Sequence, residues 1–172
     1  YDADLHGLVF KYIHFYGNTN VFRHTRSVYR REVRTIKNGQ KIRSWKDAQG
    51  FRFEDGSKIN AALIDASIYH YGWARSQQVM DKKIKSFSKL YHGKEFETQN
   101  DFTYRRIWGL KPFKGVPPKT HLEWVKANTH DIDVISLPKS YRLGDWDLMV
   151  SDFIEFLTGY RIGEYRNYRL KS

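Results

Sequence analysis

A histidine at the end of a strand-like run is the first residue in this sequence that could do chemistry. His70 lies in the segment 68–73 (IYHYGW), after an apolar run and two residues before a glycine. This position predicts an imidazole at the edge of a sheet, and neutral imidazole can bind Mn, Fe or Zn. A single histidine needs carboxylates from elsewhere to complete a metal site. A hydrogen-bonded structural histidine is the alternative, and the residue types alone leave both interpretations open.

Arginine and aromatic residues form a second set of candidate ligand-binding groups. By strand alternation, Arg30 and Arg34 share one face of the predicted strand 27–37. A guanidinium group can bind two phosphate oxygens at once, although a solvated strand face is the alternative for these arginines. Aromatic side chains near polar segments can stack on a sugar ring, and the candidates are Trp45 and Trp73. Tyr71, next to His70, is a further aromatic candidate for contact with a diphosphate or an acceptor.

Strands in the first part of the chain must position these side chains. The run 8–16 is aromatic and β-branched, with apolar residues on both alternating faces. It is therefore predicted to be a central strand that is buried on both sides. The run 27–37 is predicted to turn at 38–39 (Asn-Gly) into a hairpin toward 41–42.

A second hairpin loop is predicted at 54–57 (EDGS), where glycine tolerates a positive φ. The strand that follows it, over 58–71, alternates between apolar and mixed positions. Alternation places Asp65 and His70 on opposite faces of that strand.

Helices are predicted after Gly72, where the apolar period changes from two to about 3.6 residues. The first helix ends near Gly93, the second covers 119–128, and the third covers 145–158 with Asp145 as its N-cap. The first has an apolar stripe of Met80, Ile84, Phe87 and Tyr91. The third is predicted to turn inward Trp146, Met149, Val150, Phe153 and Leu157.

The order of these elements predicts a mixed α+β fold in a single domain, 1–172. Its strand-rich part is 1–73, a sheet with hairpins, and its helical part is 74–172, which packs on the sheet. The helical part ends in an extended tail over 160–170, expected to pack back through Tyr165 and Tyr168.

Composition limits the classes of partner and the cellular locations that we expect. The chain has 30 Lys and Arg against 19 acidic residues, a net charge of +11, which favours phosphates, nucleic acid or an anionic membrane surface. The absence of cysteine excludes disulfides and thiolate sites and fits a reducing compartment. No apolar run approaches the roughly 18 residues of a membrane span. We therefore expect a cytoplasmic protein, with peripheral contact at the inner face of the membrane as an alternative.

Four segments together resemble bacterial glycosyltransferases of the large family 2 type, which have a GT-A fold. They match in order and spacing, and they are 7–17 (GLVFKYIHFYG), 29–36 (YRREVRTI), 68–73 (IYHYGW) and 158–168 (TGYRIGEYRNY). The resemblance implies the acceptor half of such an enzyme. The nucleotide-binding half, with its Asp-x-Asp metal motif, is expected in an N-terminal part that precedes Tyr1. The strings 131–133 and 145–147 have the Asp-x-Asp form but follow the His70 segment, so neither is assigned this role.

The resemblance also implies roles for individual residues. His70 is expected to help hold a divalent metal, Mn or Mg, or the diphosphate itself, with carboxylates from the N-terminal half as the other ligands. Asp47 lies where the resembling enzymes place their acidic residue, so it is the expected general base, and Asp65 is the alternative. Arg30 and Arg34, with the three aromatic candidates, are expected to contact the diphosphate or the acceptor.

The expected function is transfer of a sugar, with inversion, from a nucleotide-sugar donor to a hydroxyl acceptor such as a carbohydrate. The chain by itself is expected to be an incomplete enzyme. Two alternatives come from other classes: a basic nucleic-acid-binding domain, for which the sequence shows no specific motif, and a non-catalytic carbohydrate-binding module.

Overall fold

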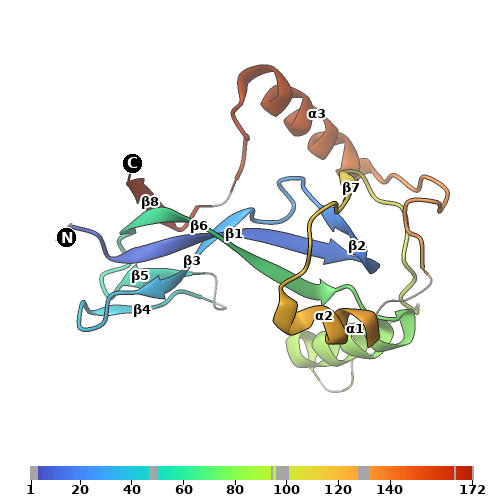
Figure 1. The fold of residues 1–172 in the computed structure, drawn as a ribbon, viewed down its shortest axis with the longest axis horizontal. Coiled ribbons are helices and arrows are strands. Elements are labelled where there is room, and N and C mark those ends of the chain that lie inside the picture. Colours follow the sequence, from blue (N-terminus) through green and yellow to red (C-terminus); the bar gives the residue numbers. More distant parts are fainter. Residues whose placement is uncertain are drawn as a thin grey trace. The chain divides into compact units, whose positions relative to one another are not determined.

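The computed structural model describes residues 4–46, 50–93, 95, 101–127, 132–164 and 166–171. Within these ranges the fold is mixed α+β, as the sequence predicts, with a mostly open sheet and three α-helices (Figure 1). The larger sheet has the strand order β7 (Leu110–Pro112), β2 (Asn18–Arg23), β1 (Gly7–Tyr16), β6 (Ile59–Trp73) and β8 (Tyr168–Lys171). β3 (Arg31–Ile36) pairs with β1 beside this path. Among the residues described, no helix is long and apolar enough to cross a bilayer.

The chain divides into two compact units, and the long strands β1 (Gly7–Tyr16) and β6 (Ile59–Trp73) each contribute residues to both. Unit 1 is formed by Tyr1–Ile13, Arg26–Ile68 and Ser151–Ser172, and unit 2 by His14–Thr25 and Tyr69–Val150. The central place of β1 in the strand order confirms that the run 8–16 is a central strand. Burial on both sides is not confirmed along its whole length, because Lys11 is exposed and its neighbours Phe10 and Tyr12 are only partly buried.

In unit 1, a short strand pairs with each of the two long strands. β3 (Arg31–Ile36) pairs antiparallel with β1, and β8 (Tyr168–Lys171) pairs parallel with β6. The buried residues of its core come from these four strands, and they are Val9, Val33, Ile59, Ala61 and Tyr168. Tyr168 is 5% exposed, so the tail does pack back through this residue, whereas Tyr165 lies outside the described residues.

The hairpin predicted after Asn38-Gly39 is wrong. β4 (Ile42–Ser44) does not pair with β3 but forms a separate two-stranded sheet with β5 (Phe51–Phe53). β4 joins β5 instead, because Ile42 and Phe53 lie opposite each other there and both pack against the core of unit 1. The turn at 54–57 is confirmed: Arg52 and Lys58 bridge across it, and Gly56 has a φ of +83°.

Unit 2 contains a strand that the sequence did not indicate. β2 (Asn18–Arg23) returns antiparallel along β1 and pairs on its other edge with β7 (Leu110–Pro112). Its polar start, Asn-Thr-Asn, hides the strand pattern in the sequence. Gly17 makes the tight reversal with a φ of +76°, and an added Cβ there would lie 2.3 Å from Val134 Cγ1.

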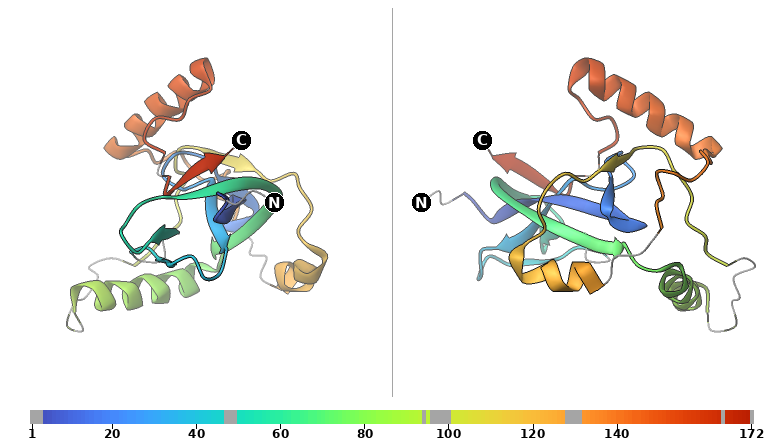
Figure 2. Two further views of the ribbon diagram at one scale, coloured as in Figure 1. Left: turned by 90° about the vertical axis from the view of Figure 1, so that its left-hand side faces the viewer. Right: turned by 45° about the vertical axis from the view of Figure 1, so that its right-hand side comes forward.

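Helices α1 (Gln77–His92) and α2 (Leu122–Ala127) also belong to unit 2; they overlap in Figure 1 but are clearly separate in Figure 2. A 3-10 turn, η1 (Lys119–His121), leads into α2, so both predicted helices are confirmed. Ser76 caps α1 by accepting a hydrogen bond from the Val79 amide. The core of this unit gathers around the buried residues Tyr16, Val21, Met80, Tyr104 and Val134.

The third helix, α3 (Leu143–Thr158), corrects two predictions. Asp145 is not the N-cap: it lies inside the first turn, and its Oδ2 accepts a hydrogen bond of 2.7 Å from the amide of Arg142, the residue before the helix. The predicted inward face is largely exposed, with Trp146 at 64%, Phe153 at 61% and Leu157 at 63%. An apolar stripe shows that a helix has a face to bury, but it does not show what will cover that face.

Candidate functional site

The structure brings His70 next to a second histidine of unit 2, His14. The two Nδ1 atoms lie 3.2 Å apart, and the ring centroids are 4.9 Å apart. His14 is only 5% exposed. At this separation one Nδ1 carries a proton and the other accepts it, because two unprotonated or two protonated nitrogens would repel. Gly72 leaves room for the His70 ring, since an added Cβ there would lie 2.6 Å from His70 Cε1.

Arg23 extends this pair into a row across three neighbouring strands. In the antiparallel register of β1 and β2, Arg23 lies directly opposite His14, and residues opposite each other share a face of the sheet. Burial lowers the pKa of Arg23, the charge of Arg105 lowers it further, and Tyr16 and Asp145 act in the other direction. The guanidinium still carries its charge at neutral pH because its ordinary pKa is so high.

Two more arginines lie near Tyr16 in the same unit. Burial raises the pKa of the Tyr16 phenol, although the charges of Arg23, Arg105 and Arg142 favour its ionised form. The phenol donates a hydrogen bond of 3.3 Å to the Arg105 carbonyl. Asp145 offsets part of the positive charge through a 3.4 Å ion pair with Arg105 Nη1. We name Arg23, Arg105, Arg142 and Asp145 the Tyr16 cluster, and its net positive charge suits an anion.

The imidazole pair also has metal-binding capacity, but it is not a complete metal site. Among the residues that the structure describes, no group of three or more His, Asp or Glu side chains could hold a metal ion. With their Nδ1 atoms in contact, His14 and His70 can supply one nitrogen ligand, the unprotonated Nε2 of the ring that donates from Nδ1. Nitrogen ligands suit Mn better than Mg, and the remaining oxygen ligands would have to come from other residues.

The two candidate bases are placed very differently. Asp47 lies outside the described residues. Asp65, in unit 1, is 97% exposed and forms a 2.7 Å ion pair with Lys11. The hydrogen bond and the charge of Lys11 lower the pKa of Asp65, which makes its carboxylate a weaker base.

The arginine candidates of unit 1 have protein partners. Arg30 Nε lies 2.6 Å from Glu164 and its Nη1 lies 2.7 Å from Glu155. Burial acts to lower the pKa of Arg30, but the bonds and charges of Glu164 and Glu155 together raise it. Arg34 donates to the hydroxyl of Tyr12 and, over 3.3 Å, to that of Tyr29. A phosphate at Arg30 would have to compete with two carboxylates.

The aromatic candidates pack against other side chains. In unit 1, the Arg52 guanidinium lies over the Trp45 ring, 4.5 Å from the ring centroid. In unit 2, Tyr71 stacks on Phe15 at 4.8 Å and 7°, and burial raises the pKa of its phenol. Trp73 packs against the core of unit 2, and the Lys83 ammonium lies over its ring, 5.6 Å from the ring centroid.

The sequence-predicted residues therefore divide between the two units. Unit 1 contains Asp65, Arg30, Arg34 and Trp45, and unit 2 contains His70, Tyr71 and Trp73. Sequence reasoning missed His14 as the partner of His70, and Arg23 as the residue opposite His14. Alternation along 8–16 does put His14 on one face with Tyr12 and Tyr16. Only the strand order reveals that β1 lies between β6 and β2.

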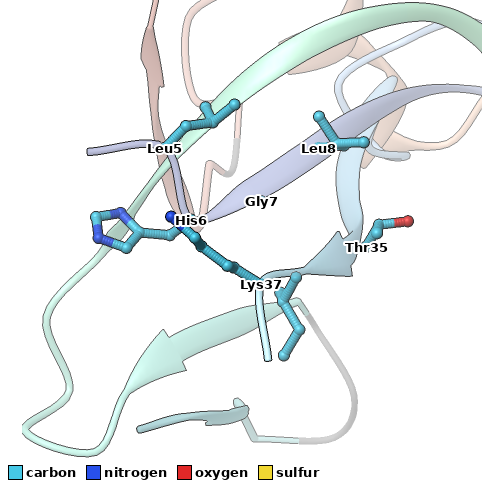
Figure 3. Close-up of a pocket in the computed structure, with 7 residues that line it drawn as sticks. Leu5, His6, Gly7, Leu8, Thr35 and Lys37 are labelled. Carbon is cyan, nitrogen blue, oxygen red and sulfur yellow. The ribbon is translucent and has the colours of Figure 1, made fainter. Parts of the chain in front are cut away.

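Unit 1 also has a hollow of about 400 Å³ where the start of β1 meets the end of β3 (Figure 3). Apolar groups predominate in its lining, which comprises Leu5, His6, Gly7, Leu8, Thr35, Ile36 and Lys37. Gly7 is required here, because an added Cβ would lie 2.9 Å from the Thr35 carbonyl oxygen. The hollow contains none of the sequence-predicted site residues and no carboxylate, so it is not the candidate site.

Comparisons with protein-family models, with curated proteins and with solved structures gave no match. The candidate site therefore stands on its own geometry: the His14–His70 pair, with Arg23 beside it, in unit 2.

Proposed function

We propose that this chain is the acceptor-side part of an inverting glycosyltransferase that uses a nucleotide-sugar donor. The observation that carries the proposal is the 3.2 Å contact between His14 and His70, with Arg23 opposite His14 in the sheet. A sugar nucleotide leaves as a diphosphate, and its departure develops negative charge that nearby positive groups or donors can stabilise.

The tautomers required by the imidazole contact supply two complementary functions. When both rings are neutral, the ring that accepts at Nδ1 carries its proton on Nε2 and can donate to a phosphate oxygen. The ring that donates from Nδ1 has an unprotonated Nε2, which can ligate a divalent ion. Each histidine thereby fixes the protonation of the other. Arg23 adds a permanent charge to the same face.

A divalent ion, Mn or Mg, would neutralise the diphosphate as a Lewis acid. The ring with the unprotonated Nε2 would be its nitrogen ligand, and carboxylates from the N-terminal part of the enzyme would be its oxygen ligands. For the proton of the acceptor hydroxyl we assign Asp47 as general base. The ion pair of Asp65 with Lys11 supports this choice, because it weakens Asp65 as a base.

Pyrophosphate, titrated with and without Mn²⁺, is the direct probe of the pair, because the nucleoside itself is expected to bind elsewhere. His14→Asn and His70→Asn should each weaken binding by about 10-fold or more, the usual scale for a lost hydrogen bond to a charged group. His92→Asn is the matched control, since His92 is exposed at the end of α1 in the same unit. Equal binding by all variants would contradict the proposal.

The catalytic part of the proposal is tested in the enzyme that contains both halves. Asp47→Asn should lower kcat by about 100-fold, as expected for a missing general base. His70→Asn should keep the fold, lower kcat and reduce the dependence on divalent ions. A variant that loses thermal stability while its folded fraction keeps the wild-type metal response would assign His70 a structural role. A nucleic-acid-binding or plain glycan-binding domain would respond to neither substitution in a metal-dependent way.

A further inference from the structure

The apolar stripe of α1 extends beyond the core that it packs against. Met80, in the first turn, is fully buried, and Ile84 packs against the same cluster. Further along, the exposed fraction is 48% for Phe87, 76% for Leu90 and 63% for Tyr91. The second half of the helix therefore presents three large apolar side chains to solvent.

A hollow of about 380 Å³ continues this surface toward the sheet of unit 2. It is lined by Trp73, Met80, Lys83, Ile84, Phe87, Ser88, Tyr91 and His92. Lys83, one of the lining residues, donates to the Gly72 carbonyl at 2.8 Å, and its ammonium lies 5.8 Å from the centroid of the Phe87 ring. The surface is thus aromatic with a cation within it, rather than uniformly apolar.

The charged residues of α1 are mostly basic. The helix contains four lysines, 82, 83, 85 and 89, and one acidic residue, Asp81. Lys85 pairs with Asp81 at 2.7 Å and with Asp101 at 2.6 Å. Lys82 and Lys89 are exposed, and the whole chain carries a net charge of +11.

We propose that the second half of α1 docks this chain on the surface of a bilayer rich in anionic lipids. Phe87, Leu90 and Tyr91 would enter the interface between headgroups and acyl chains, where aromatic and apolar side chains are favoured. Lys82 and Lys89 would meet lipid phosphates, and each basic residue near such a surface strengthens binding. This surface is independent of the His14–His70 pair.

Charge complementarity favours an anionic lipid surface as the partner of α1, as a comparison with α3 shows. α3 also exposes large apolar residues, among them Phe156 at 84%, but its charged residues are Asp145, Asp147, Asp152 and Glu155, all acidic. An anionic bilayer repels that helix and attracts α1. The exposed apolar residues of α3 therefore serve as an internal control.

The test is co-sedimentation of the chain with vesicles of phosphatidylcholine, with and without phosphatidylserine. Binding should require phosphatidylserine and weaken as salt is raised. Leu90→Ser with Tyr91→Ser, and separately Lys82→Glu with Lys89→Glu, should weaken it by about 10-fold or more. Phe156→Ser, and Lys114→Glu with Lys119→Glu, are matched controls that should change it by less than about 2-fold. Unchanged circular dichroism spectra would show that each variant is folded.

Three results would overturn the proposal. Equal binding to pure phosphatidylcholine removes the role of charge. If the Lys114 and Lys119 control lost as much vesicle binding as the Lys82 and Lys89 variant, the binding would not depend on α1 in particular. Full competition by soluble glycerophosphate indicates a small-anion site instead of a surface. As a positional check, lipids brominated on their acyl chains should quench a tryptophan placed by Leu90→Trp more than one placed by Phe156→Trp, and equal quenching would also count against docking through α1.

Discussion

Each unit contains a group of three arginines, and the two groups are neutralised to different degrees. In unit 1, Arg30, Arg161 and Arg166 share Glu155 and Glu164 through ion pairs of 2.6 to 2.8 Å. In unit 2, the three arginines of the Tyr16 cluster are offset by Asp145, whose ion pair with Arg105 is longer, at 3.4 Å.

The difference separates a structural use of arginine from a binding use. Glu164 is 7% exposed at its side chain, and each arginine of the unit 1 group already has a carboxylate partner within the protein, with which a ligand would have to compete. The Tyr16 cluster keeps a positive surplus beside the His14–His70 pair, and such a surplus attracts phosphate groups. The sequence shows arginines in both places and gives no sign of this distinction.

Removing one carboxylate from unit 1 should have the largest effect on stability. Glu164→Gln leaves Arg30 with a weaker partner in a half-buried site and should lower the free energy of unfolding by about 2 to 3 kcal/mol. Urea denaturation measures this change. Glu123→Gln makes the same chemical change at an exposed position of α2 and should have a much smaller effect. Equal losses in both variants would mean that the unit 1 network is not structural.

Acidification should weaken unit 1 through the same residue. Burial acts to raise the pKa of Glu164, but the bonds and charges of Arg30 and Arg166 lower it below its ordinary value. A carboxyl group with a lowered pKa in the folded state stabilises the fold above the unfolded pKa of about 4.3. That contribution is lost as the pH falls through the folded pKa. Urea midpoints from pH 7 to pH 3 should therefore fall more steeply for the wild type than for Glu164→Gln, and parallel curves would contradict this.

Removing the carboxylate of the Tyr16 cluster should strengthen anion binding in unit 2. Asp145→Asn keeps an acceptor for the Arg142 amide but removes a negative charge next to Arg105. Affinity for pyrophosphate should rise by about 3- to 10-fold, measured by titration calorimetry at low salt. Asp147→Asn, exposed on the same helix, is the control and should leave the affinity nearly unchanged. A decrease for Asp145→Asn would place the anion elsewhere.

The smallest effect is expected at the exposed ion pair of unit 1. Asp65→Asn removes the partner of Lys11, but Asp65 is 97% exposed, and exposed pairs contribute little because water and salt screen them. The thermal midpoint should stay the same within error. If it fell as far as that of Glu164→Gln, exposure would be a poor guide to the role of carboxylates in unit 1.

Local patterns in the sequence were sufficient for several elements. The two-faced apolar run at 8–16 predicted the central strand β1, and the stripe from Met80 to Tyr91 predicted α1, with Gly93 at its end. These predictions succeeded because strand and helix periodicity depend on neighbours a few residues apart. The same holds for the turn at 54–57, where Gly56 adopts the positive φ that its residue type permits.

Contacts between distant parts of the chain were decided by the tertiary structure. His14 and His70 are 56 residues apart, and Arg30 and Glu164 are 134 apart, so no local pattern could pair them. The strand order decided that β3 joins β1 and that β4 joins β5, against the hairpin expected from Asn38-Gly39. The sequence by itself determined the long strands β1 and β6, the three helices and which residues carry charge. Only the packing of those segments determined which charges are neutralised, because burial and pairing are set by whichever distant strand or helix comes to lie beside a residue.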